Sequence, residues 1–115
     1  PDALEPSQSG LMQPHTYTPI SNPVTGDRCL ILQTSADELR LRFWIAPRSG
    51  GAPLHFHRSL TETSRVVEGV MTLELDGEGR FSELRAGDGV RIPPGRLHSF
   101  SNPHSEWLVF EAHLH

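Results

Sequence analysis

Two short segments of the sequence carry residue types that together could bind a metal ion. The first contains His55-Phe56-His57 and, five residues after the second histidine, Glu62. The second contains His98, which follows a Pro-Pro-Gly bend at 93–95. Three imidazoles and one carboxylate form a mixed nitrogen and oxygen ligand set that suits Mn, Fe, Ni, Cu or Zn. We therefore predict a site for one divalent transition metal, whose identity the sequence leaves open.

The spacing of these four residues is compatible with a shared cavity. His55 and His57 are two residues apart, so on a strand their side chains leave the same face. The odd interval from His57 to Glu62 would put Glu62 on the opposite face of a continued strand. The chain must therefore bend between them to return Glu62 beside the histidines. The bend before His98 can fold its strand back across the same cavity, and the surrounding glycines and prolines mark such turns.

The rest of the chain predicts many short strands. Ten glycines and ten prolines among 115 residues suit tight turns between strands better than a helical bundle. Between Glu38 and Ala46 the side chains alternate as in a strand with one buried face, formed by Leu39, Leu41, Phe43 and Ile45. The segment Pro47 to Pro53 is predicted as a loop. We expect roughly eight to ten strands in a sandwich or barrel, including 28–34, 38–46, 63–68, 70–76, 81–85, 89–92, 97–101 and 107–114.

The length and charge of the chain limit its organisation and partners. At 115 residues it has room for one core, with residues 1–14 as a flexible N-terminal arm and 15–115 as a single barrel domain. The net charge of −4 gives no basic footprint, so we expect neither nucleic acid nor a membrane surface as partner.

The compartment is predicted from what the sequence contains. There is no apolar run long enough to span a bilayer, and a single cysteine, Cys29, allows no internal disulfide. We therefore expect a cytoplasmic protein. Because the chain begins with Pro1 instead of Met, we also expect it to be processed, trimmed or excised from a longer chain.

The two segments resemble the two sequence motifs of the cupin superfamily. The second motif is matched at Gly87, Pro93, Gly95, His98 and Asn102. The first motif is matched at His55, His57, Glu62 and Gly69. It departs at its leading glycine, where this chain has Ser49 with Gly50 next to it. So many spaced matches in one short chain make the resemblance specific, and they cover about half of the sequence.

The resemblance implies an all-β fold, a double-stranded β-helix (jelly-roll) barrel of roughly six to eight strands. It implies a metal inside the barrel, held by His55, His57, Glu62 and His98. It also leads us to expect a homodimer that exchanges its N-terminal arm or an edge strand.

The barrel interior is expected to bind a small aromatic or aliphatic molecule. Its apolar lining is predicted to include Val66, Met71, Leu73, Phe100 and Val109. Ser64 is two residues after Glu62, so on a strand its side chain should also point inward. Many relatives carry an aromatic side chain at this position. A serine there leaves space and a hydroxyl near the metal, which favours a bulkier or more polar ligand.

Four protein ligands leave about two positions on a six-coordinate metal for water, O₂ or substrate. Our leading hypothesis is a metal-dependent oxidoreductase similar to the small quercetinase-like dioxygenases of the superfamily. Glu62 has a second candidate role as a general base when off the metal, although a carboxylate bound to a dication is a poor base. The alternatives are a non-catalytic barrel that binds or senses a small molecule, and a sugar isomerase- or epimerase-like enzyme.

Other polar residues are predicted to have structural roles. We expect ordinary hydrogen-bonded side chains at His15, His104, His113 and His115. Cys29 is predicted to be a buried core residue, and Asn102 and Pro93 to be turn-formers. Solvated positions are expected for Arg40, Arg42, Arg65 and Arg91. An arginine that points into the barrel would instead favour a carboxylate or phosphate substrate.

Overall fold

The computed structural model describes residues 20–22 and 25–115, and within these ranges every regular element is a β-strand. The fold is therefore all-β, as predicted. No helix in this part of the chain is long and apolar enough to cross a membrane. The predicted arm at 1–14 and His15 lie outside the described residues.

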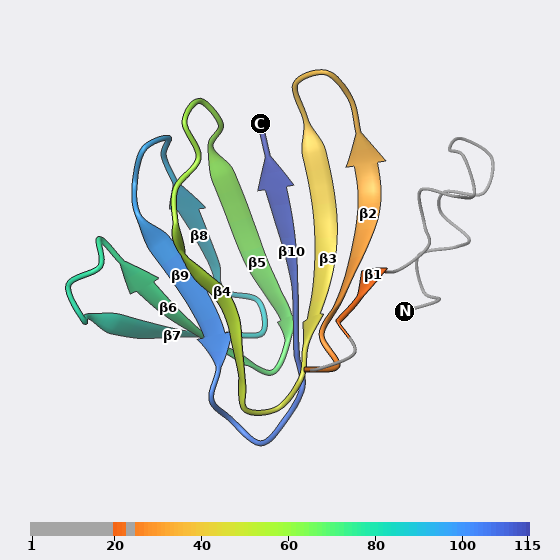
Figure 1. Ribbon diagram of the computed structural model, residues 1–115, viewed down its shortest axis with the longest axis vertical. Coiled ribbons are helices and arrows are strands. Elements are labelled where there is room, and N and C mark those ends of the chain that lie inside the picture. The colour runs from red at the N-terminus through yellow and green to blue at the C-terminus, as the bar shows by residue number, and fades with distance from the viewer. Residues whose placement is uncertain (1–19, 23–24) are drawn as a thin grey trace.

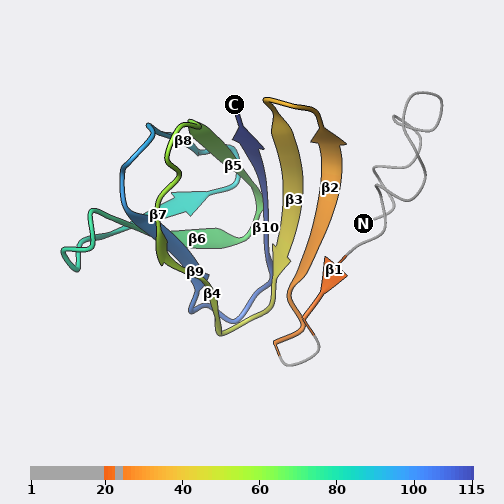
Figure 2. The same ribbon diagram turned by 45° about the horizontal axis from the view of Figure 1, so that its top comes forward.

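The strands form two antiparallel sheets that face each other (Figure 1). The six-stranded sheet has the order β1-β2-β3-β10-β5-β8, and the four-stranded sheet has the order β4-β9-β6-β7. Figure 2 shows the smaller sheet curving across β10, β5 and β8, while β2 and β1 extend the larger sheet to one side. The strand bounds are β1 Ile20–Ser21, β2 Arg28–Thr34, β3 Leu39–Ile45, β4 Ser49–His55, β5 Glu62–Glu68, β6 Val70–Leu75, β7 Phe81–Arg85, β8 Gly89–Ile92, β9 His98–Asn102 and β10 Leu108–Leu114.

The main core fills the space between the two sheets. Three aromatic rings lie at its centre, with ring centroids 4.9 Å apart for Phe43 and Phe110 and 4.6 Å apart for Phe100 and Phe110. Phe43 and Ile45 both pack into this core, as the alternation along β3 predicts. The buried members of the core are Ile45, Val66, Met71, Leu73, Ile92, Phe100, Leu108, Phe110 and Ala112.

Val109 does not line the barrel, so this part of the prediction is wrong. It pairs with Trp44 across β10 and β3, whereas its neighbour Phe110 pairs with Phe43. Because paired residues share a face, Val109 lies on the outer side of the sheet, where it packs with Leu30 and Trp44 in a second cluster. Three consecutive apolar residues at 108–110 hide the alternation, so the local pattern does not show which of them point inward.

The segment predicted as a loop at Pro47 to Pro53 mostly forms β4, an irregular edge strand beside β9. Its register with β9 shifts on both sides of the Ala52–Phe100 pair. Gly51 has a φ of 64°, and a Cβ there would collide with the carbonyl oxygen of Phe100. Gly51 thus allows close contact between β4 and β9, whereas the prediction interpreted Gly50 and Gly51 as part of a loop.

Hydrogen bonds of two buried polar residues, Ser49 and Asn102, hold the start of β4 in place. Ser49, at the position of the missing motif glycine, is buried and donates its hydroxyl to Oδ2 of Asp27 at 2.8 Å. Asn102, at the end of β9, is fully buried. Its Nδ2 lies 3.1 Å from the carbonyl oxygens of Ile45 and Ala46. These contacts fix the end of β4 from which the strand runs toward His55.

Candidate metal centre

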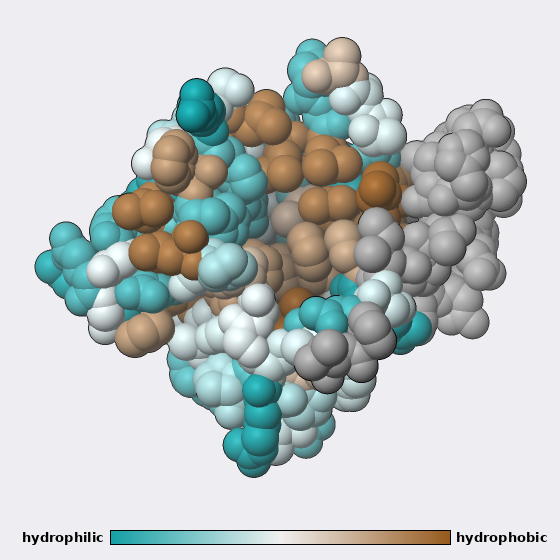
Figure 3. Space-filling view, in the orientation of Figure 1, coloured by the Kyte–Doolittle hydropathy of each residue, from teal (hydrophilic) through white to brown (hydrophobic). Residues whose placement is uncertain are grey.

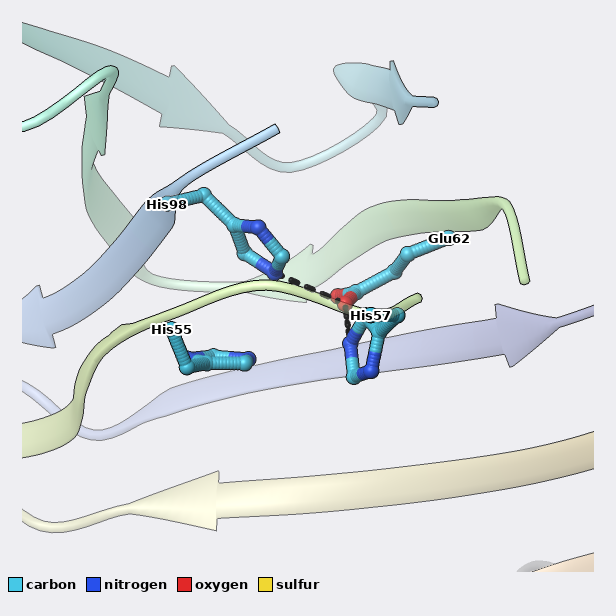
Figure 4. A group of neighbouring side chains, drawn as sticks. All are labelled: His55, His57, Glu62 and His98. Atoms are coloured by element: carbon cyan, nitrogen blue, oxygen red, sulfur yellow. Dashed lines mark hydrogen bonds and ion pairs between the residues drawn. The ribbon is translucent and has the colours of Figure 1, made fainter. Parts of the chain in front are cut away.

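The predicted ligand side chains come together, with Glu62 and His98 buried and His55 and His57 half-buried. One ligand atom from each of His55, His57, Glu62 and His98 lies within 4.8 Å of all the others. The ring centroids are 4.3 Å apart for His55 and His98, and 5.4 Å apart for His57 and His98. Figure 4 shows the His57 and His98 rings on either side of the Glu62 carboxylate, with the His55 ring beside them.

The ends of three strands position these side chains. His55 ends β4 and His98 begins β9, and the two residues are direct partners across the strand pair. Glu62 begins β5, and His57 lies in the connection between β4 and β5. The amide of Gly95 donates to the carbonyl oxygen of His57 at 2.7 Å. This bond ties the Pro-Pro-Gly bend to the connection that carries His57.

Hydrogen bonds fix the orientation of two of the rings. The Nδ1 atom of His98 lies 3.0 Å from the carbonyl oxygen of Arg96, and Nδ1 of His55 lies 2.7 Å from that of Pro53. A carbonyl oxygen only accepts, so each Nδ1 carries a proton and donates. In the neutral ring, Nε2 is then left with its lone pair free for a cation.

The Glu62 carboxylate faces these nitrogens. Its Oε1 lies 3.1 Å from Nε2 of both His57 and His98. A neutral Nε2 lone pair and a carboxylate oxygen repel each other at this distance, so a proton or a cation must lie between them. Ser64 donates its hydroxyl to Oε2 at 2.7 Å. The donor set therefore fits a divalent metal.

Burial and hydrogen bonding shift the pKa values of Glu62 and His98 in opposite directions. Glu62 is 4% exposed and His98 is 0% exposed. Burial raises the pKa of the Glu62 carboxyl, but hydrogen bonds with His98, Ser64 and His57 outweigh it and bring the pKa to about 2. For His98, burial lowers the pKa, but the hydrogen bond to Glu62, the hydrogen bond to the backbone carbonyl of Arg96 and the charge of Glu62 together outweigh it and raise the pKa above its usual value. Glu62 is thus ionised at any physiological pH.

A mainly apolar cavity of about 250 Å³ has a wall that includes Ala52, three residues before His55 along β4, and none of the four candidate ligands lines it. It lies between the edge strand β4 and strands β2 and β3, where Figure 3 shows a hollow lined by apolar residues. The Ala52–Phe100 pair at its wall is the next aligned pair along β4 and β9 from His55–His98. The apolar part of the wall is formed by Cys29, Phe43, Ile45, Ala52 and Phe100.

The sequence profile of the Cupin domain family matches residues 42–112, which is more than half of the chain. This chain is a member of the cupin family. The match contains both motifs and all four candidate ligands. No curated protein matches the sequence.

Solved structures of other cupins share the fold. An RmlC-like cupin from Shewanella frigidimarina is 20% identical, with a TM-score of 0.73 over 90% of this chain and 86% of that one. A predicted oxalate decarboxylase from Thermotoga maritima is 23% identical, with a TM-score of 0.73 over 90% and 96%. A sugar phosphate isomerase from Silicibacter pomeroyi is 20% identical, with a TM-score of 0.70 over 77% and 59%. Their differing names show that the cupin fold alone does not assign a reaction.

The other predicted residues of this cupin divide between the barrel and the surface. Val66, Met71, Leu73 and Phe100 are buried in the main core, and Ser64 is buried beside Glu62. The three described histidines outside the candidate centre bind other partners. His104 contacts Thr72 and Glu83, His113 contacts Glu38, and His115 contacts Thr63.

Part of the cavity wall was not predicted from the sequence. Ala52 was missed because its strand was predicted as a loop. Cys29 was predicted in the core, but it is only half-buried and lines the cavity, where burial raises the pKa of its thiol. Phe43 and Ile45 were expected to be buried, and the alternation along β3 was the signal that could have placed them here.

Proposed function

We propose that this cupin is a metal-dependent oxidoreductase, dioxygenase-like, that acts on a small organic substrate beside a single divalent transition metal. The metal would be held by His55, His57, Glu62 and His98. The observation that carries the proposal is the convergence of these four ligand atoms, and an apolar cavity whose wall includes Ala52, three residues before His55 along β4, offers a place for the substrate.

The arrangement of the donor atoms supports a metal site more strongly than the number of donor residues does. Two histidine Nε2 atoms face one carboxylate oxygen at 3.1 Å. His98 donates from Nδ1 to a carbonyl oxygen, so in its neutral form the Nε2 lone pair faces the carboxylate, and a dication bound between them turns this repulsion into bonds. The nitrogen and oxygen set suits Mn, Fe, Ni, Cu or Zn.

When bound, a redox-active metal in this set supplies the capacity to oxidise a chelating substrate with O₂. The protein residues would do the rest. Ser64 holds the Glu62 carboxylate in place, and the backbone carbonyls of Arg96 and Pro53 hold two imidazoles in the binding tautomer. A carboxyl whose pKa is about 2 is a weak base, so these contacts favour Glu62 as a ligand over a general base.

The cavity supports an apolar substrate. Phe43, Ile45 and Phe100 form much of its wall, and such a surface excludes water and favours aromatic or aliphatic groups. The one arginine at the wall, Arg28, has its guanidinium 5.6 Å from the Trp44 ring, which belongs to the outer cluster. A sugar phosphate would require a cation aimed into the cavity, so the lining favours oxidation of an apolar molecule over sugar isomerisation.

Oxygen uptake tests this proposal. The protein is purified, stripped of metal, and reloaded in turn with Fe²⁺, Mn²⁺, Ni²⁺, Cu²⁺ or Zn²⁺. We expect a catechol-like or diketone substrate to drive steady oxygen uptake with at least one redox-active metal and none with Zn²⁺. The matched control is a His98→Ala protein carried through the same loading.

Two results would contradict the proposal. Tight capture of the organic molecule without turnover by any loaded form would favour a binding or sensing barrel. Conversion of a sugar substrate with Zn²⁺ and without oxygen uptake would favour an isomerase.

We further propose that the chain forms a homodimer, as expected from its resemblance to other cupins, and that it is cytoplasmic, as expected from its single cysteine and the lack of a long apolar run. Light scattering coupled to size exclusion measures the mass directly. A monomer mass at micromolar concentration would contradict the dimer.

A further inference from the structure

The outer face of the six-stranded sheet carries an excess of arginine. The register places Arg40, His113, Thr63 and Arg91 in one row across β3, β10, β5 and β8. The next outward row holds Arg42, Glu111 and Arg65. Residues between these rows, such as Ser64 and Ala112, are buried, so both rows face outward. This face is basic although the chain has a net charge of −4.

A pocket of about 220 Å³ lies on this face. The polar part of its wall is formed by Arg40, Thr63, Arg65, Glu111 and His113. Arg40 on β3 and Arg65 on β5 stand on either side of β10, so their strands are roughly 10 Å apart. The long side chains of arginine can close much of this distance, which leaves room for a small molecule between the two guanidinium groups.

The carboxylates near the pocket already have partners. Glu111 accepts a hydrogen bond from Nε of Arg42 at 2.8 Å. Glu38, which also attracts Arg40, lies 2.7 Å from Nε2 of His113. Arg65 forms no ion pair or side-chain hydrogen bond with any residue in 20–22 or 25–115. Within the described part of the chain, positive charge at Arg65, and much of that at Arg40, thus has no carboxylate partner of its own.

We propose that this pocket binds a small oxyanion, a carboxylate or a phosphate group, between the guanidinium groups of Arg40 and Arg65. The Thr63 hydroxyl lies at the same wall, 3.3 Å from Nε2 of His115, and it can donate to the anion when that nitrogen carries the proton of this contact. Guanidinium groups bind these anions through paired N–H donors, and such charge-assisted hydrogen bonds are stronger than neutral ones. The ligand class is therefore a metabolite-sized carboxylate or phosphate ester.

This anion pocket is separate from the candidate metal centre. Thr63 and Arg65 leave β5 on its outer face, whereas Glu62 and Ser64 are buried on the inner face of the same strand. The pocket would bind an anion whether or not the metal centre is occupied, so it does not rest on the proposed oxidoreductase function.

Calorimetric titration of the whole chain with inorganic phosphate and with succinate, in a low-chloride buffer, tests the pocket. We expect saturable 1:1 binding of at least one anion. Arg40→Gln and Arg65→Gln should each weaken it about tenfold, the effect of losing a charge-assisted contact. Arg80→Gln is the matched control, because it removes the same charge from an exposed turn where Arg80 pairs with Glu78 at 3.0 Å.

The two probes also separate the ligand classes. Binding of phosphate alone would assign a phosphate site, and binding of succinate alone would assign a carboxylate site. The proposal is overturned if neither anion saturates at millimolar concentration, or if Arg80→Gln weakens binding as much as the pocket variants. Both pocket arginines are exposed, and unchanged thermal unfolding of the variants would confirm that they fold.

Discussion

Ser64 donates its hydroxyl to Oε2 of Glu62 at 2.7 Å, and both side chains are buried. The two residues alternate with outward-facing Thr63 along β5, so the strand itself sets their contact. The bond leaves Oε1 of Glu62 turned toward the imidazoles. Ser64 thus orients the only carboxylate of the candidate metal centre.

Replacing Ser64 by alanine should therefore weaken metal binding without removing a ligand. Loss of an outer partner of a metal ligand costs about 10- to 100-fold in affinity, and we expect the lower end because the histidines remain. Competition with a coloured chelator measures the change. Ser82→Ala, in an exposed position on β7, is the control. Equal affinity in the two variants would show that Ser64 does not orient Glu62.

His98→Ala should have a larger effect, because it removes a ligand that is fully buried. We expect the metal affinity to fall by more than about 100-fold, beyond the usual loss for an outer partner. Metal analysis after dialysis measures this. His104→Ala is the matched control, because His104 is half-buried but contacts Thr72 and Glu83, and it should retain metal. Similar metal contents for the two variants would contradict the assignment.

Metal should reverse the pH dependence of stability. Without metal, the raised pKa of His98 means that protonation stabilises the fold. This contribution is complete below the unfolded pKa of about 6.5 and is lost as pH rises through the folded pKa. The Glu62 pKa of about 2 adds stability above its usual 4.5, which is lost as pH falls toward 2. The metal-free protein should therefore be most stable between about pH 4.5 and 6.5.

With metal the direction is opposite, because imidazoles bind metal only when neutral. The extra stability from metal should fall steeply below roughly pH 6. Thermal unfolding from pH 5 to pH 8, with chelator and with added metal, gives both curves. Parallel curves would mean that His98 and Glu62 do not share a metal.

The sequence predicted that the four residues of the candidate metal centre would come together, because their chemistry and spacing are local. Three local patterns can be recognised without knowing the fold: His-x-His, a carboxylate after a bend, and a third histidine after Pro-Pro-Gly. The strands at 28–34, 81–85 and 89–92 were also predicted with the bounds that the structure has. In each of these segments the turn residues on both sides mark where the strand ends.

The cavity wall was less predictable because it depends on contacts between distant strands. In the run Leu108-Val109-Phe110 all three residues are apolar, so only pairing with β3 shows that Val109 faces outward. Gly50 and Gly51 read as a turn, because the close approach of β9 that requires Gly51 is invisible in the sequence. Both errors concern tertiary pairing, which a local pattern does not contain.

The two adjacent glycines of β4 provide the sharpest test of that interpretation. At Gly51, with a φ of 64°, an alanine would be strained, and its Cβ would collide with the carbonyl oxygen of Phe100. We expect Gly51→Ala to lower the free energy of unfolding by about 2 kcal/mol or more. A methyl group at Gly50 would have no neighbouring atom within 4 Å, so Gly50→Ala should change the free energy of unfolding by less than about 0.5 kcal/mol.

Urea unfolding of the two variants measures this difference under identical conditions. Because Gly51 lies beside Phe100 and four residues before His55, the strained variant should also shift β4 and weaken metal binding, while Gly50→Ala keeps both properties. Equal stability of the two variants would mean that β4 does not pair closely with β9. The strand would then have no fixed position from which to direct His55 toward His98.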